Sequence, residues 1–328
     1  MRAIVIESPS RERPVMGLAE APEPVTGPGD VLVEVAFGGC NYADTMMRSG
    51  VYPHPKGYPL VAGIEFAGIV GKVGAGVRGI AVGDRVSAFS EGAGGFAERC
   101  AVPAERVVRL PDSISLRQGA AFYIQGMTAW CILHLVSTTR PGDTILLHAA
   151  GGGLGLFVVQ LAKAAGARLI GTVGTPGKEA RPLAFGADAV VNRAEGDFVA
   201  VALAFTEGRG VDKIVDSTGA TILDRSFAAL RRLGHVVSVG EAEGKPLPNL
   251  WERLVERSAT FTRLHVGHVD FRSDAWQRGV SDVLGGIAEG RFHVPVEEVY
   301  PFAEAGAMMD RLLSRRVSGK LLLEVSGG

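Results

Sequence analysis

The chain has 328 residues, of which 47% are hydrophobic and 21% charged, and its formal net charge is −1. This length predicts two domains, and the apolar content excludes a generally disordered chain. The balanced charge provides no basic field for nucleic acid or an anionic membrane, and no apolar run reaches the length of a membrane span. The three cysteines, Cys40, Cys100 and Cys131, lie far apart without a C-x-x-C spacing. They favour the reducing cytoplasm over a disulfide framework or a structural zinc site.

The first hundred residues are predicted to form short β-strands. Apolar or alternating runs, separated by Pro, Gly and Asp turns, occupy Ala3–Ile6, Val31–Val35, Glu65–Val73 and Asp84–Phe89. This pattern is typical of an antiparallel barrel or sandwich. Over Leu116 to Leu135 the apolar spacing becomes helical.

The segment from Thr144 to Gly174 predicts a βαβ unit. An apolar run is followed by a turn of small residues, an apolar stripe at helical spacing and a second apolar run at Arg168–Val173. In the turn, the three positions of a G-x-G-x-x-G fingerprint are held by Ala150, Gly152 and Gly155. Such a turn lets backbone amides approach a pyrophosphate at the positive end of the helix. The strand–turn–helix context therefore indicates a dinucleotide-binding site.

Further βα units follow this segment. The remaining strands are predicted at Ala189–Val191, Val211–Asp216, Val236–Val239 and Ala259–Leu264, with helices around Phe198–Phe205 and Leu223–Arg232. Six strands alternating with helices indicate a complete doubly wound sheet. The tail is predicted to contain a helix at Asp274–Glu289, a strand near Val294–Val299, a helix from Glu304 to Leu313 and a strand at Leu321–Val325. We expect this tail to pack on the first domain, with the chemistry in a cleft between the domains.

The end of the second predicted strand indicates the phosphate form of the cofactor. An NAD site usually has an acidic residue there, about twenty residues past the fingerprint, but this chain has Gly174 and Thr175. Cationic side chains follow at Lys178, Arg181 and Arg193. A missing carboxylate and added cations suit a 2′-phosphate, so the sequence favours NADPH over NADH.

Motifs spread over the whole chain carry a family resemblance. They are Asn41-Tyr42-Ala43-Asp44, Arg48-Ser49-Gly50-Val51-Tyr52-Pro53, Gly83-Asp84-Arg85-Val86, Ala149 to Gly155, Gly171 to Thr175 with Lys178, Val215-Asp216-Ser217 with Gly219, and Ser314-Arg315 with Gly319-Lys320. Together they resemble the zinc-free quinone oxidoreductases, relatives of zeta-crystallin within the medium-chain dehydrogenase/reductase superfamily.

The resemblance implies an α/β protein with two domains. A GroES-like β-rich catalytic domain would comprise residues 1–122 and 266–328, and a Rossmann domain with a doubly wound parallel sheet would comprise residues 123–265. It also implies NADPH as cofactor and a dimer or tetramer. We expect a homodimer formed through the sheet edge near Val236–Val239 and Ala259–Leu264.

The resemblance also implies the site residues. Asn41 and Tyr52, on either side of a turn at Arg48–Gly50, would face the nicotinamide and the substrate, and Lys178 would bind the 2′-phosphate. The residues assigned to the cofactor are Ala150, Gly152, Gly153, Leu154, Gly155, Thr175, Lys178, Arg193, Arg315 and Lys320. The family commonly has a tyrosine where this chain has Arg193, which leaves the contact on the adenosine side open.

No catalytic zinc is expected. Zinc alcohol dehydrogenases of this superfamily have a cysteine at the position of Asn41 and a histidine at that of Ile64, and neither residue here is a zinc ligand. Cys40 is one residue away and would point to the other side of a strand. His265 and His268 form an H-x-x-H without an evident third ligand, so surface or pocket histidines are the simpler interpretation.

Three functions agree with this sequence. The first is NADPH-dependent reduction of a conjugated carbonyl, either a quinone or an α,β-enone. The second is reduction of the double bond of an enoyl thioester or an alkenal. The third is NADPH binding without turnover, as in crystallins. Asn41 and Tyr52 favour an enzyme, and the variable loops around Tyr123–Gln125 and Val266–Phe271 leave the small-molecule substrate open.

Overall fold

The computed structural model describes residues 1–52, 54–245 and 247–326. Pro53 of the family motif and residues 327–328 of the predicted catalytic domain therefore lie outside the described residues. The chain divides into two compact units, one formed by Met1–Ile124 with Asp270–Gly328 and the other by Gln125–Val269. Within the described ranges, no helix is long and apolar enough to cross a membrane.

The second unit is built on a six-stranded parallel sheet. Its strand order is β11-β10-β9-β12-β13-β14, which is the doubly wound order predicted for a dinucleotide-binding domain. The strands are β9 (Thr144–Leu147), β10 (Arg168–Val173), β11 (Ala189–Asn192), β12 (Val211–Asp216), β13 (Leu230–Ser238) and β14 (Thr260–Arg263). The order reverses between β9 and β12, so the fingerprint turn after β9 lies at the point where such sheets bind their ligands.

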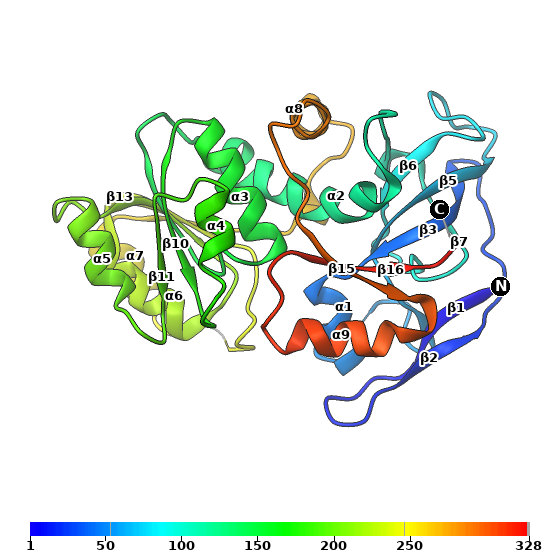
Figure 1. Cartoon of the computed structure of the whole chain (residues 1–328), viewed down its shortest axis with the longest axis horizontal. Coiled ribbons are helices and arrows are strands. Elements are labelled where there is room, and N and C mark those ends of the chain that lie inside the picture. Colours follow the sequence, from blue (N-terminus) through cyan, green and yellow to red (C-terminus); the bar gives the residue numbers. More distant parts are fainter. Residues whose placement is uncertain (53, 246, 327–328) are drawn as a thin grey trace. The chain divides into compact units, whose positions relative to one another are not determined.

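Helices cover both faces of this sheet (Figure 1). One face has α3 (Gly153–Ala164) and α4 (Ala180–Ala184), and the other has α5 (Phe198–Phe205), α6 (Ala220–Ser226) and α7 (Leu250–Arg257). Pro182 is the third residue of α4, in the first turn of the helix, where backbone N–H groups have no intrahelical partner. The helix therefore tolerates this proline and begins after Lys178.

The helix expected around Leu223–Arg232 is wrong in its second half. α6 ends at Ser226, a 3₁₀ turn occupies Phe227–Ala229, and β13 already begins at Leu230. Leu230 is buried in the core of the unit and pairs with Val211 of β12. Burial against the sheet therefore prevails over the helical spacing of the local sequence.

The first unit is rich in antiparallel strands and has the predicted GroES-like character. A three-stranded sheet contains β2 (Val15–Glu20), β1 (Arg2–Ser8) and β4 (Leu60–Val61). A seven-stranded sheet contains β15 (Val296–Pro301), β16 (Lys320–Glu324), β3 (Asp30–Gly39), β5 (Glu65–Val73), β6 (Arg85–Phe89) and β8 (Val107–Arg109), with β7 (Arg99–Pro103) also paired to β3. Because β16 pairs antiparallel with β3, strands from the N-terminal and C-terminal parts of the chain form one sheet.

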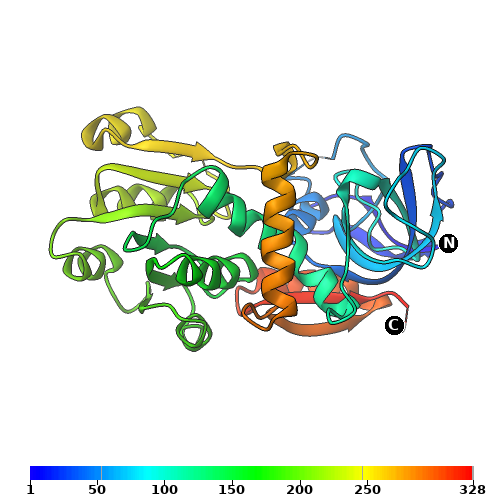
Figure 2. The ribbon, with the colours of Figure 1, turned by 90° about the horizontal axis from the view of Figure 1, so that it is seen from above.

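The helices of the first unit include one that the sequence pattern did not predict. α1 (Tyr42–Ser49) occupies the family motif, so Asn41 caps a helix rather than lying on a strand. Gly50 ends α1 with a left-handed backbone, φ 74°. The unit also contains α8 (Asp274–Ala288, orange in Figure 2) and α9 (Ala305–Leu313), while α2 (Leu116–Trp130) leads from the first unit into the second.

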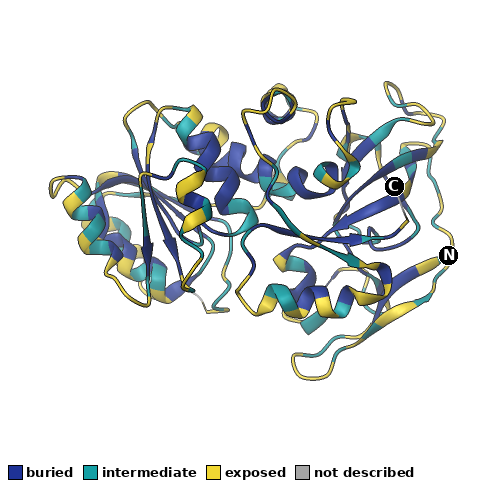
Figure 3. Ribbon diagram, in the orientation of Figure 1, coloured by how far each residue is buried: buried dark blue, intermediate teal, exposed yellow. Residues whose placement is uncertain are grey.

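Each unit has its own hydrophobic core. The inner strands of both units are largely buried, whereas β2, β14 and β15 are not, and exposed residues also gather on the outer helix faces and turns (Figure 3). The first core includes Ile4, Val33, Phe66, Phe96 and Met308. The second includes Leu146, Ile170, Phe198, Ile214 and Val236.

Candidate active site

The fingerprint turn of the second unit is tightly packed. Ala149 has a left-handed backbone with φ 54°, and the N–H of Ala150 donates to the carbonyl oxygen of Thr172 at 3.0 Å. A Cβ atom on Gly155 would lie 2.5 Å from the carbonyl oxygen of Ala149, so only glycine allows α3 to approach the turn this closely. Gly152 caps α3, and the first backbone amides of this helix remain available to an anion such as a phosphate.

Two predicted cofactor cations lie close to glycines at this end of the sheet. A Cβ on Gly151 would come within 3.2 Å of Lys178 Cε, so the lysine side chain passes directly over the fingerprint turn. A Cβ on Gly174 would lie 2.7 Å from Arg193 Nη2, so the guanidinium occupies the space beside the end of β10. This is the position at which an NAD enzyme has its acidic residue. The structure therefore places positive charge there.

Arg193 is held by a buried chain of hydrogen bonds that the sequence did not reveal. Its Nη1 donates to Thr172 Oγ1 at 2.8 Å, and Thr172 Oγ1 is 2.8 Å from His148 Nδ1. His148 Nε2 is 2.7 Å from Ser226 Oγ, which itself donates to the carbonyl oxygen of Ile222. The ring of His148 therefore donates from Nε2 and accepts at Nδ1. Burial, together with the charge of Arg193, lowers the pKa of His148 to about 3. Arg193 is therefore the one charged member of this series of hydrogen bonds.

The first unit contains a buried polar cluster of Asn41, Glu65 and Lys320. Lys320 Nζ lies 2.6 Å from Glu65 Oε2 and 2.8 Å from Asn41 Oδ1. Asn41 Nδ2 donates to Glu65 Oε2 and to the carbonyl oxygen of Gly39, both at 3.0 Å. The second carboxylate oxygen, Glu65 Oε1, accepts from the backbone N–H of Ile124 at 2.9 Å. The exposed fractions of Asn41, Glu65 and Lys320 are 5%, 0% and 2%, so these contacts replace solvent for all three.

The structure distributes the predicted site residues over four places. Lys320, assigned to the cofactor from sequence, lies in the cluster with Asn41. Tyr52 follows the end of α1, is 43% exposed, and donates its backbone N–H to the carbonyl oxygen of Met46. Arg315 is exposed, with φ 61°, in the connection between α9 and β16. Thr175, Gly153 and Leu154 lie with the fingerprint turn and the end of β10 in the second unit.

Asp44 is a further buried carboxyl next to this cluster. It is fully buried, and its Oδ2 accepts from the backbone N–H of Asn41 at 2.8 Å, which fixes the start of α1. Burial raises its pKa to about 7, although the hydrogen bond from Asn41 and the charge of Lys320 act in the opposite direction. Glu65 could not be identified as a cluster member from sequence, because 255 residues separate it from Lys320.

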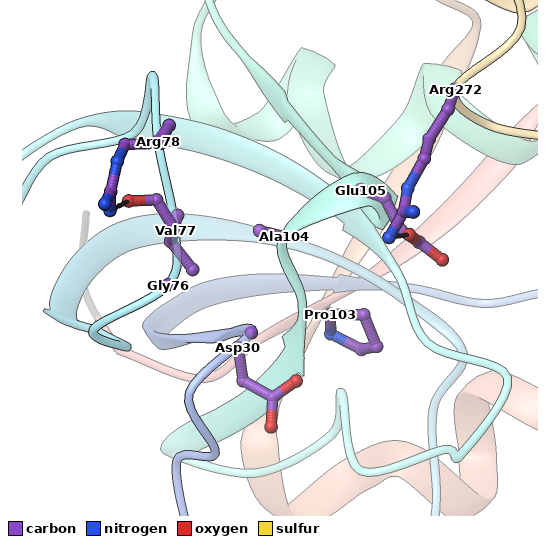
Figure 4. A pocket seen from close by; sticks show the side chains of 9 residues that line it. Asp30, Gly76, Val77, Arg78, Pro103, Ala104, Glu105 and Arg272 are labelled. Carbon is purple, nitrogen blue, oxygen red and sulfur yellow. Dashed lines mark hydrogen bonds and ion pairs between the residues drawn. The ribbon is translucent and has the colours of Figure 1, made fainter.

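Two other features lie apart from these residues. A pocket of about 500 Å³ in the first unit is lined by Gly29, Asp30, Gly76, Val77, Arg78, Pro103, Ala104, Glu105 and Arg272, of which Arg272 pairs with Glu105 (Figure 4). None of these is a predicted site residue. The rings of His265 and His268 are 4.6 Å apart, and the described residues include no group of three or more His, Cys, Asp and Glu that could hold a metal ion.

Known proteins resemble this chain over most of its length. Residues 27–112 match the alcohol dehydrogenase GroES-like domain and residues 153–283 match the zinc-binding dehydrogenase family. Quinone oxidoreductase 1 of Escherichia coli K12 is 37% identical over 90% of both chains. The 2-haloacrylate reductase of a Burkholderia species is 33% identical over 90% of this chain and 91% of its own. The crystal structure of E. coli quinone oxidoreductase complexed with NADPH superimposes with a TM-score of 0.93 and 34% identity, covering 99% of this chain and 100% of that one.

The buried Asp44 predicts a dependence of stability on pH. Its folded-state pKa of about 7 lies above the value of roughly 3.9 for an unfolded aspartate, so between these values the folded state holds a proton that the unfolded state has lost. Stability should therefore fall as pH rises through this range. Asp44→Asn keeps an acceptor for the Asn41 N–H without a charge. The difference in thermal midpoint between this variant and the parent should therefore shift in favour of the variant from about pH 5 to about pH 8. Parallel midpoint curves for parent and variant would contradict this, and the exposed Asp112→Asn should give a parallel curve.

Proposed function

Because the chain belongs to the quinone oxidoreductase family of the medium-chain dehydrogenase/reductase superfamily, we propose that it is an NADPH-dependent reductase of conjugated carbonyl compounds, quinones or α,β-enones. The observation that carries this proposal is the phosphate cradle at the start of α3, with Lys178 and Arg193 beside it. The second unit supplies the cofactor site in this account, and the first unit supplies the groups that act on the acceptor.

The residues around the cradle fit NADPH. The backbone amides of Gly153, Leu154 and Gly155 would receive the diphosphate at the helix N-terminus. Ala150 and Gly152 would shape the turn around it, because their N–H groups donate to the carbonyl oxygens of Thr172 and Ala149. Lys178 and Arg193, with Thr175, would receive the 2′-phosphate, and a carboxylate that would repel this phosphate is replaced by Gly174. When bound, NADPH supplies the hydride.

Asn41 and Tyr52 are the proposed catalytic residues of the first unit. When a conjugated acceptor receives a hydride, negative charge reaches its carbonyl oxygen through the conjugated system. Neutral N–H and O–H donors can stabilise that charge without a metal ion. The acceptor then takes a proton from water, so NADPH, one proton and the acceptor give NADP⁺ and the reduced acceptor. An unconjugated ketone develops a more localised charge and should react poorly.

A second candidate is reduction of a carbon–carbon double bond conjugated to a carboxyl group or thioester. The similarity to a 2-haloacrylate reductase favours it. Both candidates use the same hydride and the same oxyanion, and they differ only in the group attached to the conjugated carbonyl. Turnover of any of these acceptors would exclude the third function, NADPH binding without chemistry.

The proposal includes a homodimer in the cytoplasm. β14 forms the edge of the six-stranded sheet, paired only with β13 among the described strands, and an unprotected edge favours association. Trp251 and Val255, on α7 beside β13, are exposed apolar side chains. Three cysteines without disulfide spacing support the cytoplasm as the location.

Lys178→Ala should narrow the preference for NADPH over NADH. A charge-assisted contact to the 2′-phosphate is worth about 1.5–3 kcal/mol, which corresponds to roughly tenfold to hundredfold in NADPH affinity. NADH affinity, measured by the same fluorescence titration, should stay nearly unchanged. Lys163→Ala, which removes a cation paired with Asp188 at the far end of α3, is the control and should change neither affinity. An equal loss for both cofactors in Lys178→Ala would show that this lysine supports the fold or the diphosphate instead.

Tyr52→Phe should lower kcat with quinones and enones while leaving NADPH binding intact. One oxyanion donor typically contributes about 10²–10³ in turnover, and a delocalised charge should make the loss here smaller, on the order of tenfold to a hundredfold. Tyr42→Phe is the matched control, because Tyr42 is similarly exposed at the start of α1. Parent-like rates in Tyr52→Phe and in the double variant with Asn41→Ala would remove both residues from the site.

Static light scattering at micromolar concentration should report twice the chain mass of 34.4 kDa. Trp251→Glu combined with Val255→Glu places two charges on the exposed side of α7, beside β13, and should shift the equilibrium toward monomer if this surface belongs to the interface. Leu183→Glu introduces a charge at an exposed apolar position on the opposite face of the sheet and serves as control. A monomeric parent would exclude the dimer.

A further inference from the structure

The polar cluster of Asn41, Glu65 and Lys320 joins three segments of the first unit. Asn41 caps α1, Glu65 is the first residue of β5 and Lys320 is the first residue of β16. Each member contacts the other two at 2.6–3.0 Å, and all three are at least nine-tenths buried. A buried ion pair must compensate for the hydration that both charges lose, so a closed cluster with an amide in it imposes a demanding geometry.

This geometry fixes which end of the Asn41 amide faces which neighbour. A lysine ammonium can only donate hydrogen bonds and an ionised carboxylate can only accept them. Asn41 Oδ1 must therefore face Lys320, and Nδ2 must face Glu65. Turning the amide over would place two donors together and two acceptors together. The remaining Nδ2 hydrogen points to the carbonyl oxygen of Gly39. An incoming acceptor oxygen would share this hydrogen with Gly39 in a bifurcated hydrogen bond.

We propose that Lys320 and Glu65 are positioning residues of the reductase reaction. They hold the Asn41 amide in the orientation in which its Nδ2 group donates a hydrogen bond to the oxygen of the acceptor. This inference rests on the proposed function. It moves Lys320 from the cofactor, where the sequence placed it, to the acceptor side of the reaction. Lys320 has no direct contact with the acceptor in this account and acts through Asn41.

Loss of the lysine should create a new titration, because of the groups that surround Glu65. Its neighbours are Lys320 from β16, Asp44 from α1, the Cys40 thiol after β3 and the Tyr123 hydroxyl of α2. Lys320 is the cation among these groups. Without it, a buried carboxylate faces only groups that are neutral or acidic, which favours the protonated form of Glu65. A protonated Glu65 can donate a hydrogen bond as well as accept one. An ionised Glu65 without Lys320 only accepts, so it competes with the acceptor oxygen for the Nδ2 hydrogens of Asn41.

The test compares Lys320→Met with the neutral double variant Glu65→Gln/Lys320→Met. Steady-state kinetics with a 1,4-quinone and a cyclic enone are measured from about pH 5.5 to about pH 9 at saturating NADPH, and NADPH affinity is titrated separately. In Lys320→Met, kcat should fall about tenfold or more as pH rises through the new titration, while NADPH affinity stays within about twofold. The double variant should lose this pH dependence and keep a reduced kcat, because a neutral side-chain amide at position 65 no longer dictates the orientation of Asn41. Since neither position 65 nor position 320 carries a charge in it, the double variant also covers the case in which Lys320→Met unfolds at high pH.

Lys213→Met is the control for breaking any buried lysine–carboxylate pair. Lys213 is buried in the second unit and its Nζ lies 2.6 Å from Asp143 Oδ2. This variant should lower the thermal midpoint and leave the pH profile of kcat as in the parent.

Three results would overturn the inference. If Lys320→Met weakens NADPH binding tenfold while kcat and its pH profile stay those of the parent, Lys320 is a cofactor contact. If kcat and NADPH affinity in Lys320→Met both match the parent, the cluster has only a structural role. A parent enzyme that reduces neither acceptor refutes the proposed function itself, and the inference with it, and this result is distinguishable because it precedes any variant.

Discussion

A buried lysine and a buried glutamate, 2.6 Å apart, set the conditions under which the first unit can form. Each charge loses its hydration, and a partner left alone in that environment would be strongly destabilising. The pair therefore requires β5 and β16 to be present together, although 255 residues separate Glu65 from Lys320. The amide of Asn41 completes the cluster and brings the start of α1 to the same point.

The surrounding backbone is adapted to this cluster. Gly39 has no space for a side chain, since a Cβ there would lie 2.0 Å from the carbonyl oxygen of Ala120 and 3.0 Å from Lys320 Cε. β16 pairs with β3 through Leu322 and Gly39, and the backbone N–H of Cys40 donates to the carbonyl oxygen of Leu321. The returning C-terminal strand thus both completes the sheet and delivers the ammonium group to Asn41. The packing of the first unit and its polar chemistry depend on the same contacts.

Much of the architecture could be predicted from the sequence because it depends on local periodicity. The βαβ segment from Thr144 to Gly174 shows strand, turn and helix patterns directly, and the doubly wound strand order follows from them. α1 could not be predicted in this way, because it has only eight residues. Some of its residues are polar and cap the helix, as Asp44 does, so they interrupt the apolar spacing. The end of α6 was misplaced because apolar residues at helical spacing belong partly to the helix and partly to β13.

The candidate site was predicted only where its residues are close in sequence or belong to the family motifs. The fingerprint turn lies within one βαβ unit and Lys178 follows shortly after the end of that unit, so their proximity to a phosphate site could be expected. The series of hydrogen bonds from Arg193 through Thr172 to His148 and Ser226 could not, because it links residues at β11, β10 and β9 with a residue of α6. The same holds for Glu65 and Lys320, whose relation to Asn41 exists only after the chain has folded back.

Transfer of hydride from NADPH to a conjugated acceptor can be followed with an isotope label. The enzyme is incubated with each of the two C4-deuterated forms of NADPH and an α,β-enone, and the product is analysed by NMR and mass spectrometry. One of the two forms should transfer its deuterium to the β-carbon, giving a saturated ketone with a proton from water at the α-carbon. Deuterium on the carbonyl carbon, giving an allylic alcohol, or faster reduction of an unconjugated ketone would contradict the account.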